Sequence, residues 1–323
     1  MADEDGEEAH NGNAAIAVID AVLIAGPTAS GKSALALAVA RATGGAIVNA
    51  DSMQVYRELR LLSARPSLEE EAASEHRLFG FVSALEPFSV ALWLAEAQRV
   101  LAELRAAGRL AIVTGGTGLY FKALTQGLAE APKSDPDIRS AARARRAMLG
   151  VTGFHDELVR LDPASADLAP GDTQRVLRAW EVVTKSGRGL TAWKADQRPL
   201  LGAERMAGFV MEMDRPVLNE RIDARFDTMM AAGALEEARA FWALNPSEDL
   251  PATKALGLPQ LRRALGREIF LEAAVAEAKQ QSRRYAKRQG TWFRHQTPDW
   301  ARLDPERGVT AMRDAILAVL EGP

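Results

Sequence analysis

The stretch between residues 17 and 42 limits the fold of this 323-residue chain more than any other segment. The apolar, β-branched run 17–25 predicts a buried strand, and the Ala- and Leu-rich run 32–42 predicts a helix. They are joined by Gly26-Pro27-Thr28-Ala29-Ser30-Gly31-Lys32-Ser33, which fits the pattern G-x-x-x-x-G-K-S/T. A strand, a glycine loop and a helix in this order are typical of a phosphate-binding loop (P-loop) at the edge of a parallel sheet.

The residues of this loop have the chemistry that a di- or triphosphate requires. Backbone N–H groups of the loop surround phosphate oxygens, and the N-terminus of the helix adds a partial positive charge. Lys32 brings a mobile cation to the terminal phosphate, and the Ser33 hydroxyl is placed to bind Mg²⁺. The alternative is a glycine turn that binds nothing, although a chance match in a chain of this length is about one in a hundred. We therefore expect residues 26–33 to bind phosphate groups.

Further strands and helices alternate along the chain. Strands are predicted at 46–49 and 110–114 with a helix at 88–107 between them, and another strand is predicted at 208–213. This order is typical of a parallel sheet with helices on both faces. After the last strand, helical periodicity predicts helices at 217–232, 235–243 and 269–293. The expected fold class is therefore α/β, with a sheet like that of P-loop NTPases.

One internal segment differs in character from the rest. Four prolines between 132 and 170 punctuate short helical stretches, and no strong strand candidate follows until about residue 208. This predicts a helical insertion domain at 131–200, within a core made of residues 15–130 and 201–323. Residues 1–14 are acidic, small and polar, which predicts a disordered tail.

Two polar segments follow predicted strands. Asp51-Ser52 comes soon after the strand 46–49, and Thr114-Gly115-Gly116-Thr117-Gly118 ends the strand 110–114. Because ligands bind where the carboxyl ends of parallel strands meet, both segments are expected beside the P-loop. Asp51 could orient a magnesium ion, accept a proton from a nucleophile, or cap a helix that follows. The glycine pair could let the backbone approach a ligand closely, or could form a simple turn.

Composition excludes several classes of protein. The chain has no cysteine and its four histidines are scattered, so neither a disulfide framework nor a zinc motif is expected. The longest mostly apolar stretch, 14–25, is interrupted by Asp20 and is too short to span a bilayer. An acidic segment precedes it, unlike the basic start of a signal peptide. A cytoplasmic enzyme or binding protein without a membrane partner is the remaining expectation, with a monomer as the default.

Charge is unevenly distributed along the chain, although the net charge is only −3. Residues 3–8 carry five acids and no base, whereas residues 279–294 carry six bases and no acid. The basic segment is suited to a polyanion such as RNA. The alternative is a solvated helix face, and charge alone does not decide between the two.

Several motifs, taken together, resemble those of the tRNA dimethylallyltransferases, also called bacterial-type tRNA isopentenyltransferases. The resemblance extends from about residue 20 to residue 296, and the combination of motifs in this order is far more specific than the P-loop alone. Besides the P-loop, the matching segments are 51–56 (DSMQVY), 115–120 (GGTGLY), 134–136 (SDP) with Arg139, 172–179 (DTQRVLRA), 221–226 (RIDARF), 286–289 (AKRQ) and 291–294 (TWFR).

The resemblance implies a tRNA-modifying prenyltransferase. Such enzymes move the dimethylallyl group of dimethylallyl diphosphate to the N6 amine of the adenosine just 3′ of the anticodon, position 37, giving N6-isopentenyladenosine and diphosphate. Asp51, as general base, and Thr117 are then the implied catalytic residues. The P-loop, Arg225 and Mg²⁺ bound to Ser33 would hold the diphosphate leaving group.

The resemblance also implies a binding surface for the anticodon stem-loop of tRNA, gripped by the helical insertion. RNA phosphates would then account for the basic segment 279–294. The residues implied to contact tRNA are Asp51, Ser52, Met53, Gln54, Thr117, Arg139, Gln174, Arg175, Val176, Leu177 and Arg178. The sequence departs from the usual family pattern at 60–66, at 76–80 and at Leu258-Pro259, where RNA contacts rather than chemistry would be affected.

Two alternatives from other functional classes also fit a P-loop. A small-molecule or nucleotide kinase would bind ATP tightly and phosphorylate an acceptor. A non-catalytic RNA-binding ATPase would need an acid after a strand to drive hydrolysis, and Asp51 is the candidate. A kinase gives the segments 115–120 and 174–178 no obvious role.

Overall fold

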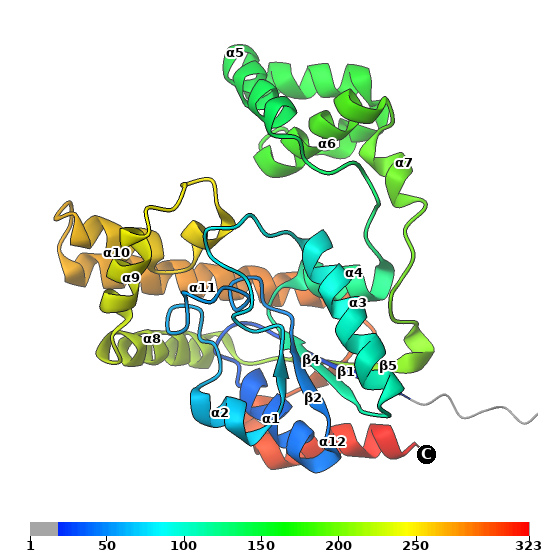
Figure 1. Ribbon diagram of the computed structural model, residues 1–323, viewed down its shortest axis with the longest axis vertical. Helices are drawn as coiled ribbons and strands as arrows, with labels where there is room; N and C mark the ends of the chain where they lie inside the picture. The colour runs from blue at the N-terminus through cyan, green and yellow to red at the C-terminus, as the bar shows by residue number, and fades with distance from the viewer. Residues whose placement is uncertain (1–18, 323) are drawn as a thin grey trace, which may run out of the picture.

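The computed structural model describes residues 19–322, and its centre is a six-stranded sheet in which neighbouring strands are parallel (Figure 1). The strand order is β3-β2-β4-β1-β5-β6. The expected α/β class is thus confirmed, while the predicted tail 1–14 lies outside the described residues. The strands are β1 (Ala21–Ala25), β2 (Ala46–Asn49), β3 (His76–Arg77), β4 (Ala111–Gly115), β5 (Met206–Met211) and β6 (Ala301–Leu303).

The central strands are buried along their whole length. Every residue of β1 and β4 is buried, because helices cover both faces of the sheet. The strand predicted at 46–49 is confirmed as β2, and the strand predicted at 208–213 is β5, at Met206–Met211. The edge strands β3 and β6 were not predicted, because two or three residues are too few to show a period-2 pattern.

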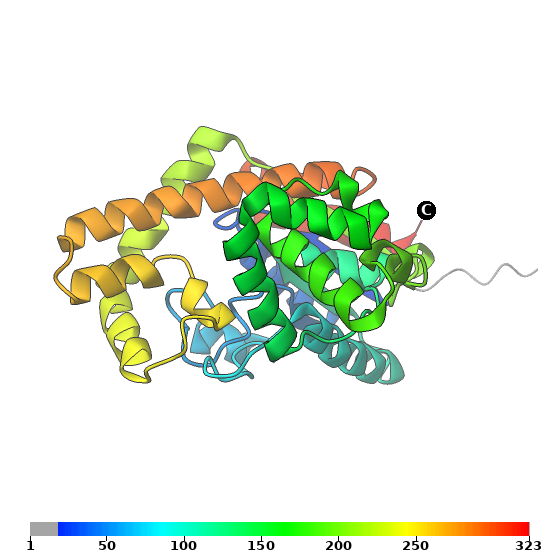
Figure 2. The ribbon, with the colours of Figure 1, turned by 90° about the horizontal axis from the view of Figure 1, so that it is seen from above.

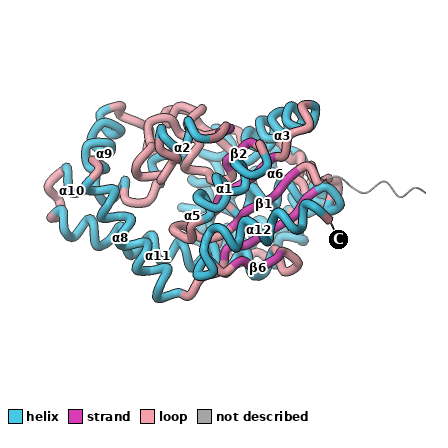
Figure 3. Tube along the Cα trace, turned by 90° about the horizontal axis from the view of Figure 1, so that it is seen from below, coloured by secondary structure: helices cyan, strands magenta, loops and turns pink. Residues whose placement is uncertain are grey.

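Two helical layers cover the sheet. One face is covered by α1 (Lys32–Thr43) and α12 (Gly308–Glu321), which Figure 3 shows lying across the strands. The other face is covered by α3 (Val90–Ala106), α4 (Gly118–Gln126) and the long helix α11 (Leu271–Gln296). The hydrophobic core therefore has two parts, one on each face.

Four further helices extend the core to one side of the sheet (Figure 1). The predicted helices at 217–232 and 235–243 are confirmed as α8 and α9, whereas α10 was not predicted. These four helices are α2 (Leu68–Ala73), α8 (Arg215–Ala231), α9 (Ala234–Ala243) and α10 (Leu258–Leu265).

The segment between α4 and β5 forms a separate group of helices, α5 (Pro136–Leu161), α6 (Thr173–Ser186) and α7 (Leu190–Lys194). In Figure 1 this group stands apart from the sheet, and in Figure 2 it lies over the core beside α11. It has a small core of its own, made of Ala142, Phe154, Leu158, Val176, Ala179 and Val183. Asp172 caps the start of α6, and Gly187 ends it in the left-handed conformation.

Candidate active site

The P-loop joins β1 to α1, and its backbone shape depends on two glycines. Gly31 has φ 92°, in the left-handed region that favours glycine. At Gly26 an added Cβ would lie 2.8 Å from the Cβ of Met211, so this position needs glycine for close packing against β5. Ser30 is fully buried, and its Oγ has no hydrogen-bond partner within residues 19–322. An orphaned hydroxyl beside the free N–H groups of a helix N-terminus is suited to an anionic ligand.

Two cationic side chains meet at this loop. Lys32 Nζ donates to the carbonyl oxygen of Pro27 at 3.1 Å, and the Arg225 guanidinium, from α8, donates to the Thr28 hydroxyl. Burial lowers the pKa of Lys32 to about 8, with the Asp51 carboxylate opposing that shift and Arg225 adding to it. Burial likewise lowers the pKa of Arg225. Within residues 19–322 neither cation has an ion-pair partner, so the loop has positive charge that a bound anion would neutralise.

Asp51 lies at the carboxyl end of β2 in a turn that Asn49 fixes. The backbone N–H of Asp51 donates to Asn49 Oδ1 at 2.8 Å, and Asn49 Nδ2 donates to the carbonyls of Asp51 and Leu78, both at 3.0 Å. Asp51 Oδ1 accepts from the N–H of Met53 at 2.9 Å. Because no helix begins here, Asp51 is not a helix cap, and among residues 19–322 no group donates to its Oδ2. One carboxylate oxygen is therefore held in place while the other is free to accept a proton.

Thr117 links this turn to the loop after β4. The N–H of Ser52 donates to Thr117 Oγ1 at 2.9 Å, and the N–H of Thr117 donates to the carbonyl of Ala50 at 3.2 Å. A Cβ at Gly115 would lie 2.1 Å from the backbone of Ala50, so glycine is required for the two loops to touch. Gly115 therefore allows a close approach of two backbones, whereas Gly116 leaves room for the Gln289 side chain. The approach brings Thr117 beside Ser52, the neighbour of Asp51.

The helix α11 forms a third wall of the site, although its basic segment 279–294 was expected only to bind a polyanion. Gln289 is 5% exposed; its Oε1 accepts from the N–H of Thr28 at 2.9 Å and its Nε2 donates to the carbonyl of Gly116 at 2.8 Å. One amide thus joins the P-loop to the loop after β4. Burial and the nearby Asp51 charge raise the pKa of Tyr285, which contacts Thr117 and Gln289. A signal existed in the sequence, because Gln289 occupies a core-facing position in helical register with Ala278, Ser282, Ala286 and Phe293.

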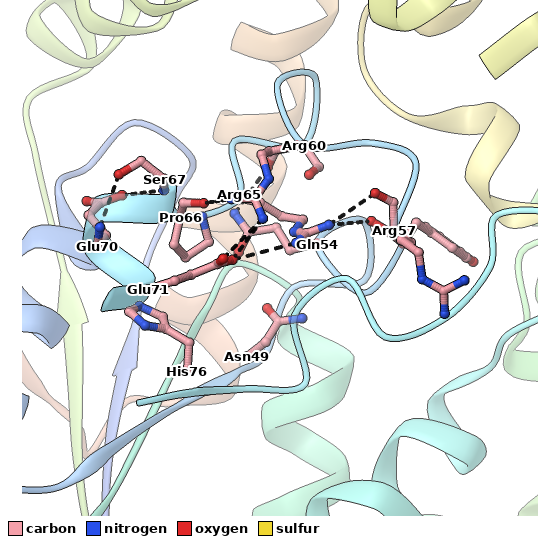
Figure 4. Close-up of polar contacts among 12 residues, drawn as sticks. Asn49, Gln54, Arg57, Arg60, Arg65, Pro66, Ser67, Glu70, Glu71 and His76 are labelled. Atoms are coloured by element: carbon pink, nitrogen blue, oxygen red, sulfur yellow. Dashed lines mark hydrogen bonds and ion pairs between the residues drawn. The ribbon is translucent and has the colours of Figure 1, made fainter. Parts of the chain in front are cut away.

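Met53 and Gln54, which follow Asp51, make different contacts. Met53 is half-buried against the core, whereas Gln54 turns its side-chain amide toward a neighbouring loop. Figure 4 shows Gln54 beside Arg60 and Arg65 of that loop and Glu71 of α2.

The predicted RNA-binding residues of the insertion lie on α5 and α6, apart from Asp51 and the P-loop. Gln174 and Arg175 are exposed, and among residues 19–322 the Arg175 side chain has an ion pair with Asp172 alone, at 3.4 Å. Arg139 and Arg178 both approach the buried carboxylate of Glu181, at 3.3 and 3.7 Å. Leu177 packs partly against the small core of this group. Val176 is fully buried there, so its side chain does not offer a surface to RNA, and we leave it out of the proposed RNA surface.

The basic segment 279–294 is divided between paired and exposed cations. Lys279 pairs with Asp227 at 2.7 Å and Arg283 pairs with Asp223 at 2.5 Å, both acids lying on α8. These two bases therefore hold helices together. Arg284, Lys287 and Arg288 are exposed and have no ion pair among residues 19–322. Only part of the segment is available to a polyanion.

No group of three or more His, Cys, Asp or Glu side chains within residues 19–322 is arranged to hold a metal ion. Ser33 is exposed at the start of α1.

None of the described helices is both long and apolar enough to cross a membrane.

Comparison with known proteins gives concordant matches. A family model described as IPP transferase matches residues 54–296, and one described as isopentenyl transferase matches residues 19–83. A tRNA dimethylallyltransferase of Nitrobacter hamburgensis is 49% identical over 306 residues, which cover 94% of this chain and 95% of that protein. One from Caulobacter sp. (strain K31) is 50% identical over 296 residues, covering 91% of this chain and 96% of that protein.

Solved structures show the same similarity. The tRNA isopentenylpyrophosphate transferase of Bacillus halodurans superposes with a TM-score of 0.68 at 31% identity, covering 94% of this chain and 97% of that chain. A eukaryotic dimethylallyltransferase acting on tRNA superposes with a TM-score of 0.72 at 24% identity, covering 88% of this chain and 74% of that chain. The latter likeness shows a shared fold.

Proposed function

Because this chain belongs to the tRNA dimethylallyltransferase family, and so prenylates tRNA with dimethylallyl diphosphate, we propose how its own residues perform that transfer. The observation that carries the proposal is the presence at the P-loop of two cations, Lys32 and Arg225, that have no ion-pair partner among residues 19–322. Gln289 joins this loop to the loop after β4, and Thr117 joins that loop to the turn that carries Asp51. The P-loop then holds the diphosphate of the prenyl donor, and the kinase and ATPase alternatives are not needed.

The proposed reaction is a substitution at the allylic carbon. The N6 amine of the adenosine at position 37 attacks that carbon, the bond from carbon to diphosphate oxygen breaks, and the diphosphate leaves with the electron pair. Lys32, Arg225 and the P-loop N–H groups stabilise the negative charge that develops on the departing oxygens. Such preorganised donors act most strongly where water is excluded, and both cationic residues are half-buried.

Asp51 is proposed as the general base that takes the proton from the attacking amine. Its Oδ1 is held by the N–H of Met53, and its Oδ2 is free to receive the proton. Thr117 orients the turn that carries Asp51, through its bond with Ser52, and lies where the target nucleotide would enter. The target base has to leave the stack of the anticodon loop to reach this site, and unpaired loop bases are the least costly to extrude.

Mg²⁺ fits the site only as an ion bound largely by the substrate. Protein sites for Mg²⁺ commonly supply one or two oxygen ligands, the rest coming from phosphates and water. The exposed Ser33 hydroxyl would supply a protein oxygen, and no cluster of three or more acids among the described residues provides an all-protein cage. When bound, the ion would neutralise charge on the diphosphate.

The helices α5–α7 are proposed to be an insertion domain, residues 131–200, that grips the anticodon stem-loop. Gln174 and Arg175 are exposed in the first turn of α6, and Arg139 and Arg178 both pair with Glu181 of the same helix. The exposed bases Arg284, Lys287 and Arg288 of α11 would contact RNA phosphates. We infer a cytoplasmic location, where the tRNA substrate is found.

The direct test is transfer of label from radioactive dimethylallyl diphosphate to unmodified tRNA, with magnesium and without ATP. We expect labelled RNA, with N6-isopentenyladenosine as the labelled nucleoside after digestion. ATP consumption with a small acceptor, and no label in RNA, would instead support a kinase.

Arg175→Ala is expected to weaken binding of tRNA with little effect on binding of dimethylallyl diphosphate. If Arg175 contacts one RNA phosphate, the loss is larger at low salt, and the slope of log K against log salt falls by roughly 0.7 to 0.9. RNA affinity measured across a series of salt concentrations gives both the loss of affinity and the change in slope. Arg99→Ala serves as the control, because Arg99 is an exposed arginine on α3 paired with Glu96 and Glu103. An Arg175→Ala slope equal to that of the control would remove α6 from the RNA surface.

A further inference from the structure

Glu237, on α9, accepts three backbone hydrogen bonds from a single loop of the core, residues 60–65. Its Oε2 accepts from the N–H groups of Arg60 and Leu61, and its Oε1 accepts from the N–H of Leu62, each at 2.8 Å. No strand or helix satisfies these donors, since loop 60–65 is made of turns. Hydrogen bonds to a charged acceptor are about twice as strong as neutral ones, so Glu237 anchors this loop firmly.

The same loop fixes the orientation of the Gln54 side chain (Figure 4). Gln54 Nε2 donates to the carbonyl oxygens of Ser63, at 3.1 Å, and Ala64, at 2.8 Å. Because both partners are acceptors, only the NH₂ end of the amide can face them. The Oε1 of Gln54 accepts from no group within residues 19–322, and so is an acceptor available to a donor outside the chain.

A second set of contacts ties loop 60–65 to the segment that carries Gln54. The Arg65 side chain, only 8% exposed, donates to the carbonyls of Tyr56, at 3.3 Å, and Arg57, at 3.2 Å. A Cβ at Gly80 would lie 2.1 Å from the Arg65 guanidinium, so the guanidinium is packed against the backbone there. Arg60 and Arg65 both approach Glu71 of α2, at 3.1 and 3.6 Å. A displacement of loop 60–65 would therefore move the segment 54–57 as well.

We propose that Glu237 is a positioning residue for RNA recognition. It fixes loop 60–65, and that loop holds Gln54 so that only its carbonyl oxygen is presented to the RNA, where it accepts from an N–H donor such as an exocyclic amine of a base. The inference rests on the proposed function, because Gln54 lies in the same turn as Asp51. Glu237 itself touches no substrate, and none of its contacts involves the P-loop.

The first test is Glu237→Gln, with the KM for an unmodified anticodon stem-loop RNA and the KM for dimethylallyl diphosphate measured separately. The substitution keeps the size of the side chain but places an NH₂ group against backbone donors. We expect the RNA KM to rise about tenfold, as for loss of a charged hydrogen bond, with the diphosphate KM unchanged. Glu236→Gln is the matched control, since Glu236 is the adjacent residue, is 66% exposed and, among the described residues, forms an ion pair with Arg239 alone. An RNA KM equal to that of the control would overturn the proposal.

A double-mutant cycle with Gln54→Ala separates positioning from general loss of structure. If Glu237 acts through Gln54, Glu237→Gln changes the RNA KM less than about twofold once Gln54 is absent. A merely structural role would give the same additional loss in both backgrounds, and that result would contradict the proposal.

Gln54→Glu provides an independent variant that leaves α9 untouched. It places a carboxylate oxygen against the carbonyls of Ser63 and Ala64, so loop 60–65 can no longer hold the side chain. We expect the same RNA-specific rise in KM, and an unchanged RNA KM would reject the locked orientation. Failure of the wild-type protein to transfer label would instead refute the proposed function, so the two failures are distinguishable.

Discussion

Asp51→Asn is expected to lower the rate of prenyl transfer by about 10²- to 10⁴-fold while leaving tRNA affinity nearly unchanged. Asparagine keeps an oxygen that can accept from the N–H of Met53, so the turn after β2 is preserved. It removes the carboxylate oxygen that we propose as the acceptor of the proton from the attacking amine. Single-turnover transfer of label, at saturating concentrations of both substrates, measures the rate, and a filter-binding titration measures RNA affinity.

Asp314→Ala provides the control for this experiment. Asp314 is exposed on α12 and, within residues 19–322, pairs only with its neighbour Arg313, so its loss should affect neither rate nor affinity. If Asp51→Asn weakened RNA binding as much as it slowed transfer, Asp51 would be a binding residue and the assignment of the base would be wrong. A rate equal to that of the wild type would show that another group accepts the proton.

The sequence predicted the central part of the fold because its signals are local. The strand β2 and the helix α1 are adjacent to glycine turns, β1 is an uninterrupted apolar run, and β4 begins with one. The helix α12 was missed, although its apolar residues Met312, Ile316 and Leu320 recur at helical spacing and pack on the sheet face that α1 covers. The edge strand β6 pairs with β5 through three residues only. Such elements are defined by tertiary contacts that no local pattern contains.

The sequence predicted which residues meet at the candidate site but not the contacts that hold them there. The motifs placed Lys32, Asp51 and Thr117 at one sheet edge, and the hydrogen bond that the N–H of Ser52 donates to Thr117 Oγ1 agrees with that arrangement. The bridge by Gln289 was not predictable, because its partners Thr28 and Gly116 lie far from it in sequence. The resemblance also grouped Val176 with its exposed neighbours on α6, although helical geometry turns successive residues to different faces.

Lys32→Met is expected to abolish measurable prenyl transfer and yet to make the ligand-free protein more stable. Methionine keeps the aliphatic stem of the side chain but removes the ammonium that we place on the diphosphate. Loss of a charged hydrogen bond of this kind lowers the affinity for dimethylallyl diphosphate about 10- to 100-fold. Isothermal titration with dimethylallyl diphosphate, and thermal unfolding without ligand, measure the two effects. Lys185→Met is the control, because Lys185 is a surface residue paired with Asp135, and such pairs contribute little.

The pH dependence of protein stability and of the affinity for dimethylallyl diphosphate follows from the pKa of Lys32, which burial lowers from 10.5 to about 8. Below pH 8 the lysine is charged in the folded and the unfolded protein, and the folded protein bears the full cost of burying that charge. Between pH 8 and 10.5 the folded protein loses the proton first, so its stability rises relative to Lys32→Met. The stabilising effect of Lys32→Met should therefore be largest below pH 8 and shrink as the pH approaches 10.5. Over the same range the wild-type protein loses the cation, and its affinity for dimethylallyl diphosphate should fall toward that of the variant. A stability difference that does not change with pH would mean that Lys32 is not buried as a charged group, and the anion site at the P-loop would lose its main support.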